Sequence, residues 1–110
     1  MRLTPEDEAW LEGYRQALAE QFPGVVERFI IYGSKARGTA TADSDLDVLL
    51  VIRDGDRRLK AALKDPGHEL SIDTDAVPSI QVFTVAEWER LGEQESVFRE
   101  AVERDGVLIR

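Results

Sequence analysis

The first 22 residues carry apolar side chains at intervals of three and four, the pattern of a helix with one face against a core. Thr4 is placed to cap this helix, Pro5 suits its first turn, and Pro23–Gly24 ends it. The apolar positions are Trp10, Leu11, Tyr14, Ala17, Leu18 and Phe22. The sequence therefore begins with an amphipathic helix.

Two runs of β-branched and aromatic residues follow, VVERFIIY at residues 25–32 and DLDVLLVI at residues 45–52. Both runs have the composition and length of strands. Every residue of the second run after Asp47 is apolar, which is typical of a strand buried on both faces. The connection between them, GSKARGTATADS, is rich in turn-forming residues.

The second half of the chain predicts a further mixture of helices and strands. Apolar spacing indicates a helix from about Arg57, whose continuation past the Asp65-Pro66-Gly67 segment is left open. A short strand is expected at 80–83, a helix after a Thr84–Glu87 capping box, a helix capped by Ser96, and a final strand in VLI. We expect one α/β (α+β) domain over residues 1–110, a small mixed sheet with helices packed on it.

Composition narrows the choice of function. The chain has 110 residues and a formal net charge of −8, which argues against an extended nucleic-acid surface and against an anionic membrane surface. It has no cysteine, so disulfides and thiolate chemistry are excluded, and no apolar run approaches the length of a membrane span. We expect a cytoplasmic protein whose partner is another protein, or a ligand whose charge is carried by a metal.

The second strand begins with two acidic residues, Asp45 and Asp47. Residues two apart on a strand project from the same face, so the two carboxylates are held side by side and repel one another. A hard divalent cation such as Mg²⁺ relieves this repulsion, and it binds through carboxylates, waters and the phosphates of a substrate. The pair therefore predicts a metal site.

The end of the first strand supplies a candidate phosphate site. Gly33 lets the backbone approach a ligand closely, and the SKAR segment after it can open a short helix whose N–H groups face an anion. Ser34 adds a hydroxyl, while Lys35 and Arg37 add positive charge to an otherwise acidic protein. A phosphate site beside a metal site is typical of Mg²⁺-nucleotide chemistry.

These residues carry a resemblance to a known family. Gly33-Ser34-Lys35-Ala36-Arg37-Gly38 followed by Ser44-Asp45-Leu46-Asp47-Val48 resembles the signature of the minimal nucleotidyltransferases of the polymerase-β-like superfamily. The strong likeness covers residues 30–52, and a weaker one runs from Thr84 to the end. The resemblance implies the nucleotidyltransferase fold and transfer of a nucleoside monophosphate, AMP in the first instance, from an NTP to an acceptor hydroxyl.

The resemblance also implies roles for particular residues. Asp45 and Asp47 would be the catalytic pair that holds Mg²⁺, in the manner of two-metal sites. The nucleotide, ATP in the first instance, would be bound by Gly33, Ser34, Arg37 and Ser44. Small members of the family are commonly paired with a separate all-helical HEPN protein, as the antitoxin of a two-component module. A HEPN-type partner is therefore expected here, and the sequence also allows a homo-oligomer.

One feature departs from the family pattern. Active members usually carry a third carboxylate on the third strand, whereas the corresponding positions here are Ser79 or Gln81, depending on register, and both are neutral. Asp73 and Asp75, just upstream, are the other candidates, with a solvated turn as the alternative interpretation. Two functions therefore remain: an active Mg²⁺-dependent nucleotidyltransferase that modifies a partner protein, or a weak or inactive relative that neutralises a HEPN-type partner by contact.

Overall fold

A computed structural model describes residues 1–41 and 44–109. Helices and strands alternate through most of the chain. In chain order the elements are α1 (Pro5–Gln21), β1 (Val26–Tyr32), α2 (Gly33–Arg37), β2 (Leu46–Ile52), α3 (Arg57–Ser71), β3 (Pro78–Thr84), α4 (Val85–Glu93), α5 (Val97–Asp105) and β4 (Val107–Leu108). Each expected element is present, and β3 is longer than the 80–83 that the sequence predicts.

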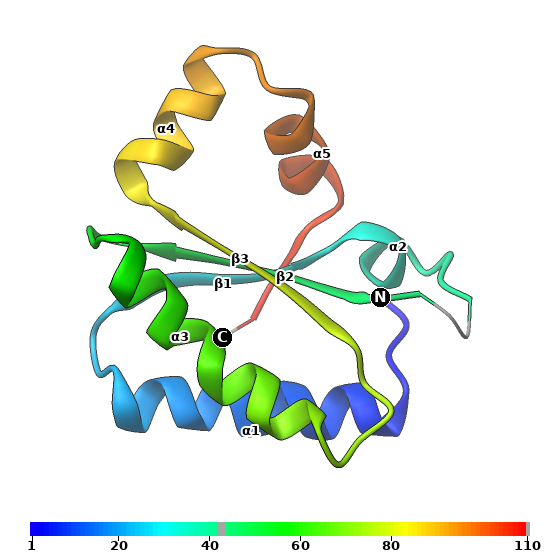
Figure 1. Cartoon of the computed structure of the whole chain (residues 1–110). Helices are drawn as coiled ribbons and strands as arrows, with labels where there is room; N and C mark the ends of the chain where they lie inside the picture. Colours follow the sequence, from blue (N-terminus) through cyan, green and yellow to red (C-terminus); the bar gives the residue numbers. More distant parts are fainter. Residues whose placement is uncertain (42–43, 110) are drawn as a thin grey trace.

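The four strands form one mixed sheet in the order β3-β2-β1-β4. β1 pairs antiparallel with β2 and with β4, whereas β2 and β3 run parallel. Figure 1 shows α1 and α3 on one face of the sheet and α4 and α5 on the other. This α+β arrangement is the small mixed sheet with packed helices that the sequence predicts. Within the described ranges, no helix has both the length and the apolar character needed to cross a bilayer.

β2 is the centre of the molecule. Its residues from Val48 to Ile52 are each at most 2% exposed, which confirms the prediction of a strand buried on both faces. Alternate side chains enter two different cores because successive residues of a strand point to opposite faces. The core beneath α1 and α3 contains Val48, Leu50 and Ile52 with Trp10, Tyr14 and Leu63, and the core beneath α4 and α5 contains Leu49, Val51, Trp88 and Val102.

The predicted helix caps are present. The Thr4 hydroxyl accepts a hydrogen bond from the backbone N–H of Asp7 at 3.0 Å, and the Asp7 carboxylate accepts one from the backbone N–H of Thr4. Thr84 and Glu87 form the same reciprocal capping box at the start of α4. Ser96 caps α5 through its hydroxyl. These caps satisfy N–H groups that have no partner inside the helix, so they place the helix starts where the sequence predicts them.

α3 continues through Pro66 and Gly67, where the sequence alone did not decide whether the helix ends. Proline removes one hydrogen bond of a helix and weakens the ladder around it. Hydrogen bonds from the neighbouring helix flank this point: Tyr14 donates to the carbonyl of Leu63 at 2.7 Å, and Trp10 donates to the carbonyl of Gly67 at 2.8 Å. These tertiary hydrogen bonds attach α3 to α1 on both sides of Pro66.

Candidate functional site

Asp45 and Asp47 lie at the start of β2. Asp45 precedes the strand and is exposed, whereas Asp47 is its second residue and is half-buried. Asp47 shares a sheet face with Leu49 and Val51, because alternate residues of a strand point the same way. Its carboxylate therefore lies on the face that α4 and α5 cover further along the sheet.

The charge of Asp45 affects the ionisation of Asp47. Partial burial raises the pKa of the Asp47 carboxyl above its usual value, the negative charge of Asp45 raises it further, and Arg37 opposes both effects. A carboxylate that is partly withdrawn from water beside a second carboxylate is destabilised in its ionised form. Two carboxylates completed by waters and phosphate oxygens are a donor set that Mg²⁺ commonly takes. The residues present therefore fit a divalent cation.

Gly33 lies directly against the Asp47 carboxylate. Its neighbour Tyr32 is the register partner of Asp47 in the antiparallel ladder, and α2 begins at Gly33 itself. The φ angle of Gly33 is 76°, and a methyl group on its Cα would lie 2.1 Å from Oδ2 of Asp47. A side chain here would meet both a backbone penalty and a collision. The turn between β1 and α2 and the start of β2 thus form one site.

Ser34 and Arg37 belong to the same short helix, α2. Ser34 is half-buried, and Arg37 is exposed at the last position of the helix. A guanidinium nitrogen of Arg37 lies 4.0 Å from the carboxylate of Asp105, at the end of α5. Its positive charge also lowers the pKa of Asp47. Arg37 therefore acts electrostatically on the acidic pair while staying accessible to solvent.

Ser44 lies directly before Asp45. Its hydroxyl accepts a hydrogen bond from the backbone N–H of Thr41 at 2.9 Å. The carbonyl of Thr41 in turn accepts from the backbone N–H of Ser44 at 3.1 Å. These two hydrogen bonds join Ser44 to Thr41 just ahead of the acidic pair.

Lys35 differs from the sequence-based expectation. We predicted that it adds positive charge to the site, and this is wrong: Lys35 is 8% exposed and its ammonium donates to the carboxylate of Asp7, which is 1% exposed. Asp7 therefore neutralises the charge of Lys35 inside the protein. In the sequence, Asp7 is recognisable only as a residue of the first helical turn, and nothing local signals a contact with residue 35.

The register of β2 and β3 decides which residue faces Asp47. Asp47 is paired with Ser79, and Gln81 is paired with Leu49 two positions further along. Asp73 and Asp75 are exposed in the segment before β3. Across residues 1–41 and 44–109, no group of three acidic or histidine side chains is placed to hold a metal ion together. The register partner of Asp47 on β3 therefore carries a hydroxyl and no carboxylate.

Tyr32 is a residue of this region that the sequence analysis did not single out. Partial burial raises the pKa of its phenol above the usual value, and the negative charge of Asp47 raises it further. Gln81 donates a hydrogen bond to the Tyr32 hydroxyl at 3.3 Å. The signal available in the sequence was its position directly before Gly33, whereas its pairing with Asp47 comes from the strand register.

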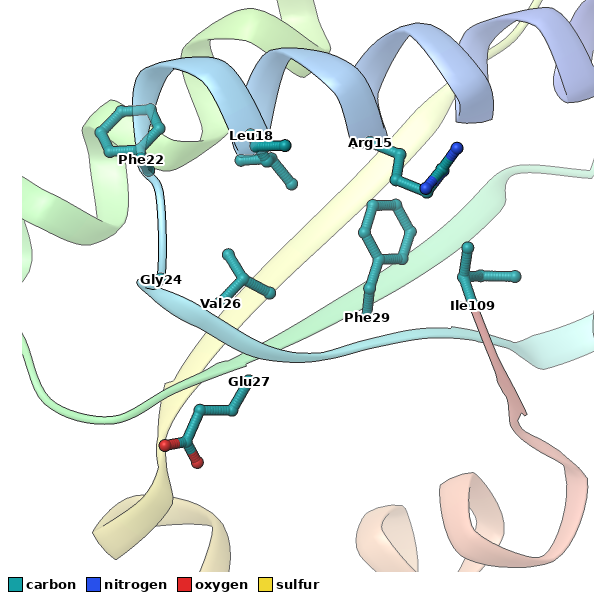
Figure 2. Close-up of a pocket in the computed structure, with 9 residues that line it drawn as sticks. Arg15, Leu18, Phe22, Gly24, Val26, Glu27, Phe29 and Ile109 are labelled. Carbon is teal, nitrogen blue, oxygen red and sulfur yellow. The ribbon is translucent and has the colours of Figure 1, made fainter.

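The cavity drawn in Figure 2 lies elsewhere, between the second half of α1, the start of β1 and Ile109. Its volume is about 260 Å³, and Leu18, Phe22, Val26 and Phe29 give it a largely apolar wall. None of the residues of the acidic pair or of the Gly33 turn lines it. Without a cluster of charged groups, this cavity does not suit a metal–phosphate ligand.

Comparisons with known proteins identify the family and the fold of this chain. The family model described as the nucleotidyltransferase domain matches residues 11–104. A candidate nucleotidyltransferase from Sulfolobus solfataricus has a solved structure with a TM-score of 0.52 at 19% identity, over 97% of this chain and 87% of that chain. The toxin-antitoxin MntA-HpeT, solved in a mutant form, has a TM-score of 0.56 at 18% identity, over 91% of this chain and 71% of that chain. No curated protein matches significantly.

At these identities the two solved structures show a shared fold. The family model shows more, because its match spans 94 of 110 residues (11 to 104) and includes both the Gly33 turn and the two aspartates of β2. This chain therefore belongs to the nucleotidyltransferase domain family.

Proposed function

We propose that this protein is a Mg²⁺-dependent nucleotidyltransferase that moves AMP from ATP to a hydroxyl of a partner protein, as the antitoxin of a toxin–antitoxin pair. The partner is a separate helical protein of the HEPN type, and the pair acts in the cytoplasm. Membership of the nucleotidyltransferase domain family supports the reaction class. The fold shared with the toxin-antitoxin MntA-HpeT supports the biological setting.

One observation carries the proposal: the Gly33 backbone lies against the Asp47 carboxylate, on which Asp45 acts through its charge. In this proposal Asp45 and Asp47 hold Mg²⁺, which when bound neutralises phosphate charge and activates the acceptor hydroxyl. Gly33 and Ser34 hold the β- and γ-phosphates, because glycine allows the backbone to approach them. Arg37 adds a positive charge at the same edge.

The transfer needs an in-line geometry around the α-phosphorus. The acceptor oxygen forms a bond to this phosphorus while the bond to the leaving pyrophosphate breaks. Ser44 contributes through its hydrogen bonds with Thr41 just ahead of Asp45. The contribution of the chain is therefore mainly positioning and electrostatic, as is usual for phosphoryl-group chemistry.

A second candidate function is favoured by one observation. Ser79 stands beside Asp47 at the position where a third acidic side chain is expected, and the described residues supply no other. Two carboxylates hold a second metal ion weakly, so the acceptor is poorly activated. The same fold would then bind nucleotide and neutralise its partner by contact, without transfer.

The test mixes the protein with ATP, Mg²⁺ and the protein encoded beside it, and measures the intact mass of that neighbour. The proposal expects an increase by one AMP, which is lost in Asp45→Asn and in Asp47→Asn. Asp54→Asn is the matched control, since Asp54 is an exposed aspartate beyond the opposite end of β2. An unchanged yield in both β2 variants contradicts the proposed roles.

The same samples separate the two candidate functions. Binding of Mg²⁺-ATP and of the neighbour, with no mass increase, is the result expected of the contact antitoxin. If neither nucleotide nor neighbour binds, both functions are refuted.

A further inference from the structure

A buried ion pair joins the first turn of α1 to α2. The ammonium of Lys35 donates a hydrogen bond to Oδ2 of Asp7, and the two residues are 8% and 1% exposed. The other ion pairs of the described residues involve side chains that are far more exposed on at least one partner. This pair is therefore a distinct feature of the fold, and the proposed chemistry does not use it.

The carboxylate of Asp7 is fixed by capping-box hydrogen bonds with Thr4 as well as by its ion pair with Lys35. The backbone N–H of Thr4 donates to the same Oδ2 atom at 3.0 Å, and the Thr4 hydroxyl accepts from the N–H of Asp7 at 3.0 Å. Burial alone would raise the pKa of Asp7, but hydrogen bonds from Lys35 and Thr4 outweigh it and lower the pKa. The carboxylate is thus an ionised, fixed anchor. A backbone hydrogen bond also links the segment before α1 to α2, because the N–H of Arg2 donates to the carbonyl of Lys35 at 2.9 Å.

α2 depends on such anchors because it is only five residues long. A helix of this length is not stable by itself, since it gains too few hydrogen bonds to offset its nucleation cost. Its N-cap, Tyr32, makes no side-chain capping bond. The position of α2 must therefore come from the groups it touches, and a buried charge tolerates very little movement away from its counter-ion.

We infer that Asp7 and Lys35 are positioning residues for the nucleotide site, an inference that rests on the proposed function. The pair holds α2 on α1, so that Gly33, the first residue of the same short helix, stays against the Asp47 carboxylate. Neither Asp7 nor Lys35 touches the nucleotide. Loss of either one shifts the phosphate-binding turn relative to the metal-binding pair.

The molecule contains a matched control. At the start of α4, Glu87 occupies the same capping-box position as Asp7 and accepts hydrogen bonds from Lys60 at 2.6 and 2.9 Å. That pair has the same chemistry and joins two helices, but the Glu87 side chain is 40% exposed and neither residue adjoins α2. Glu87→Gln therefore removes a more exposed ion pair at the same capping-box position, away from the site.

The experiment measures the dissociation constant of Mg²⁺-ATP by calorimetry for the natural protein, Asp7→Asn, Lys35→Met, the double variant and Glu87→Gln. All are compared at a temperature where circular dichroism shows each to be folded. We expect each single site variant to bind about tenfold more weakly, as is common when a group supporting a ligand-binding residue is lost. The double variant should bind no more weakly than the weaker single variant, because the pair acts as a unit. Glu87→Gln should bind like the natural protein.

Hydrogen exchange supplies a readout that needs no nucleotide. Amides 33–37 should exchange faster in Asp7→Asn and Lys35→Met and at the natural rate in Glu87→Gln. The double variant leaves no buried charge unpaired, so it keeps the test available if a single variant does not fold.

Three results would overturn the inference. If both single variants bind Mg²⁺-ATP normally and only melt earlier, the pair merely stabilises the fold. If Lys35→Met binds weakly and Asp7→Asn binds normally, Lys35 contacts the phosphates directly. If the natural protein itself does not bind Mg²⁺-ATP, the proposed function fails, and that failure is distinct from the first two because it appears before any substitution.

Discussion

Replacement of Gly33 by alanine should disturb the candidate nucleotide site while leaving the fold intact. The new methyl group would lie 2.1 Å from Oδ2 of Asp47 and 3.1 Å from its Cγ, but 3.4 Å from its Cβ, which is an ordinary contact. Rotation of the Asp47 side chain therefore relieves the overlap without movement of β2. The carboxylate is displaced while the backbone stays in place.

The magnitude follows from the backbone angle. Gly33 has a φ of 76°, and a residue with a Cβ in this left-handed region costs about 1 to 2 kcal/mol. Since the overlap is removed by side-chain rotation, the total loss of unfolding free energy should stay near this range. For a domain near this size, each kcal/mol lowers Tm by about 4 to 8 °C. Binding of Mg²⁺-ATP should fall much further, because one of the two carboxylates proposed to hold Mg²⁺ has moved.

The assay pairs urea unfolding with calorimetric titration of Mg²⁺-ATP, and two glycines serve as controls. Gly24 and Gly38 have φ angles of 74° and 78°, and among the described residues no atom lies within 4 Å of the place that a new methyl group would take. Gly24→Ala and Gly38→Ala should show the same loss of stability as Gly33→Ala and keep the affinity. Gly38 caps the C-terminus of α2, so its substitution strains the same helix without touching Asp47.

The reasoning is refuted if Gly33→Ala binds Mg²⁺-ATP as the natural protein does. It is also refuted if Gly24→Ala and Gly38→Ala lose the same affinity as Gly33→Ala, because strain alone would then explain the effect.

Three further predictions follow from other contacts. The pKa of Asp7 is lowered in the folded protein, so its ionised carboxylate stabilises the fold fully above the unfolded pKa and less as the pH falls through the folded pKa. Urea unfolding between neutral pH and about pH 3 should therefore show a steeper loss of unfolding free energy for the natural protein than for Asp7→Asn. Ser79→Asp adds a carboxylate beside Asp47 and should tighten Mg²⁺ binding by calorimetry, whereas the neutral Ser79→Asn should not. Tyr14→Phe removes a buried hydrogen bond to Leu63 and should lower the free energy of unfolding by about 1 to 3 kcal/mol in the same urea assay; no change would show that water replaces the phenol.

Several elements were predictable because neighbouring residues specify them. Thr4 with Pro5, Thr84 with Glu87, and Ser96 mark helix starts through bonds within one turn, and each cap is found where the sequence places it. The burial of β2 followed from its unbroken apolar run, which no edge strand could carry without exposing it to water. The Gly33 turn and the two aspartates were recognisable for a similar reason: their residue types and spacing are unusual together.

Other features depend on residues far apart in the chain. The partner of Asp47 on β3 is Ser79 because of the parallel register, which neither strand specifies by itself. The partner of Lys35 is Asp7, 28 residues earlier, so the positive charge expected from Lys35 at the site is absent. The attachment of α3 to α1 likewise uses hydrogen bonds between residues about 50 positions apart.

By itself, the sequence determined the order of the elements, their caps and the central buried strand, because propensity, capping and hydrophobic spacing act over a few residues. The class of chemistry was indicated by the resemblance of the Gly33 turn and the two aspartates to a known family. Only the tertiary structure decided that Gly33 touches Asp47, that a hydroxyl stands where a third carboxylate was sought, and that Lys35 is neutralised within the core. The reason is physical: strand register and buried ion pairs are set when distant segments pack together, and their free energy exists only once both partners have left water.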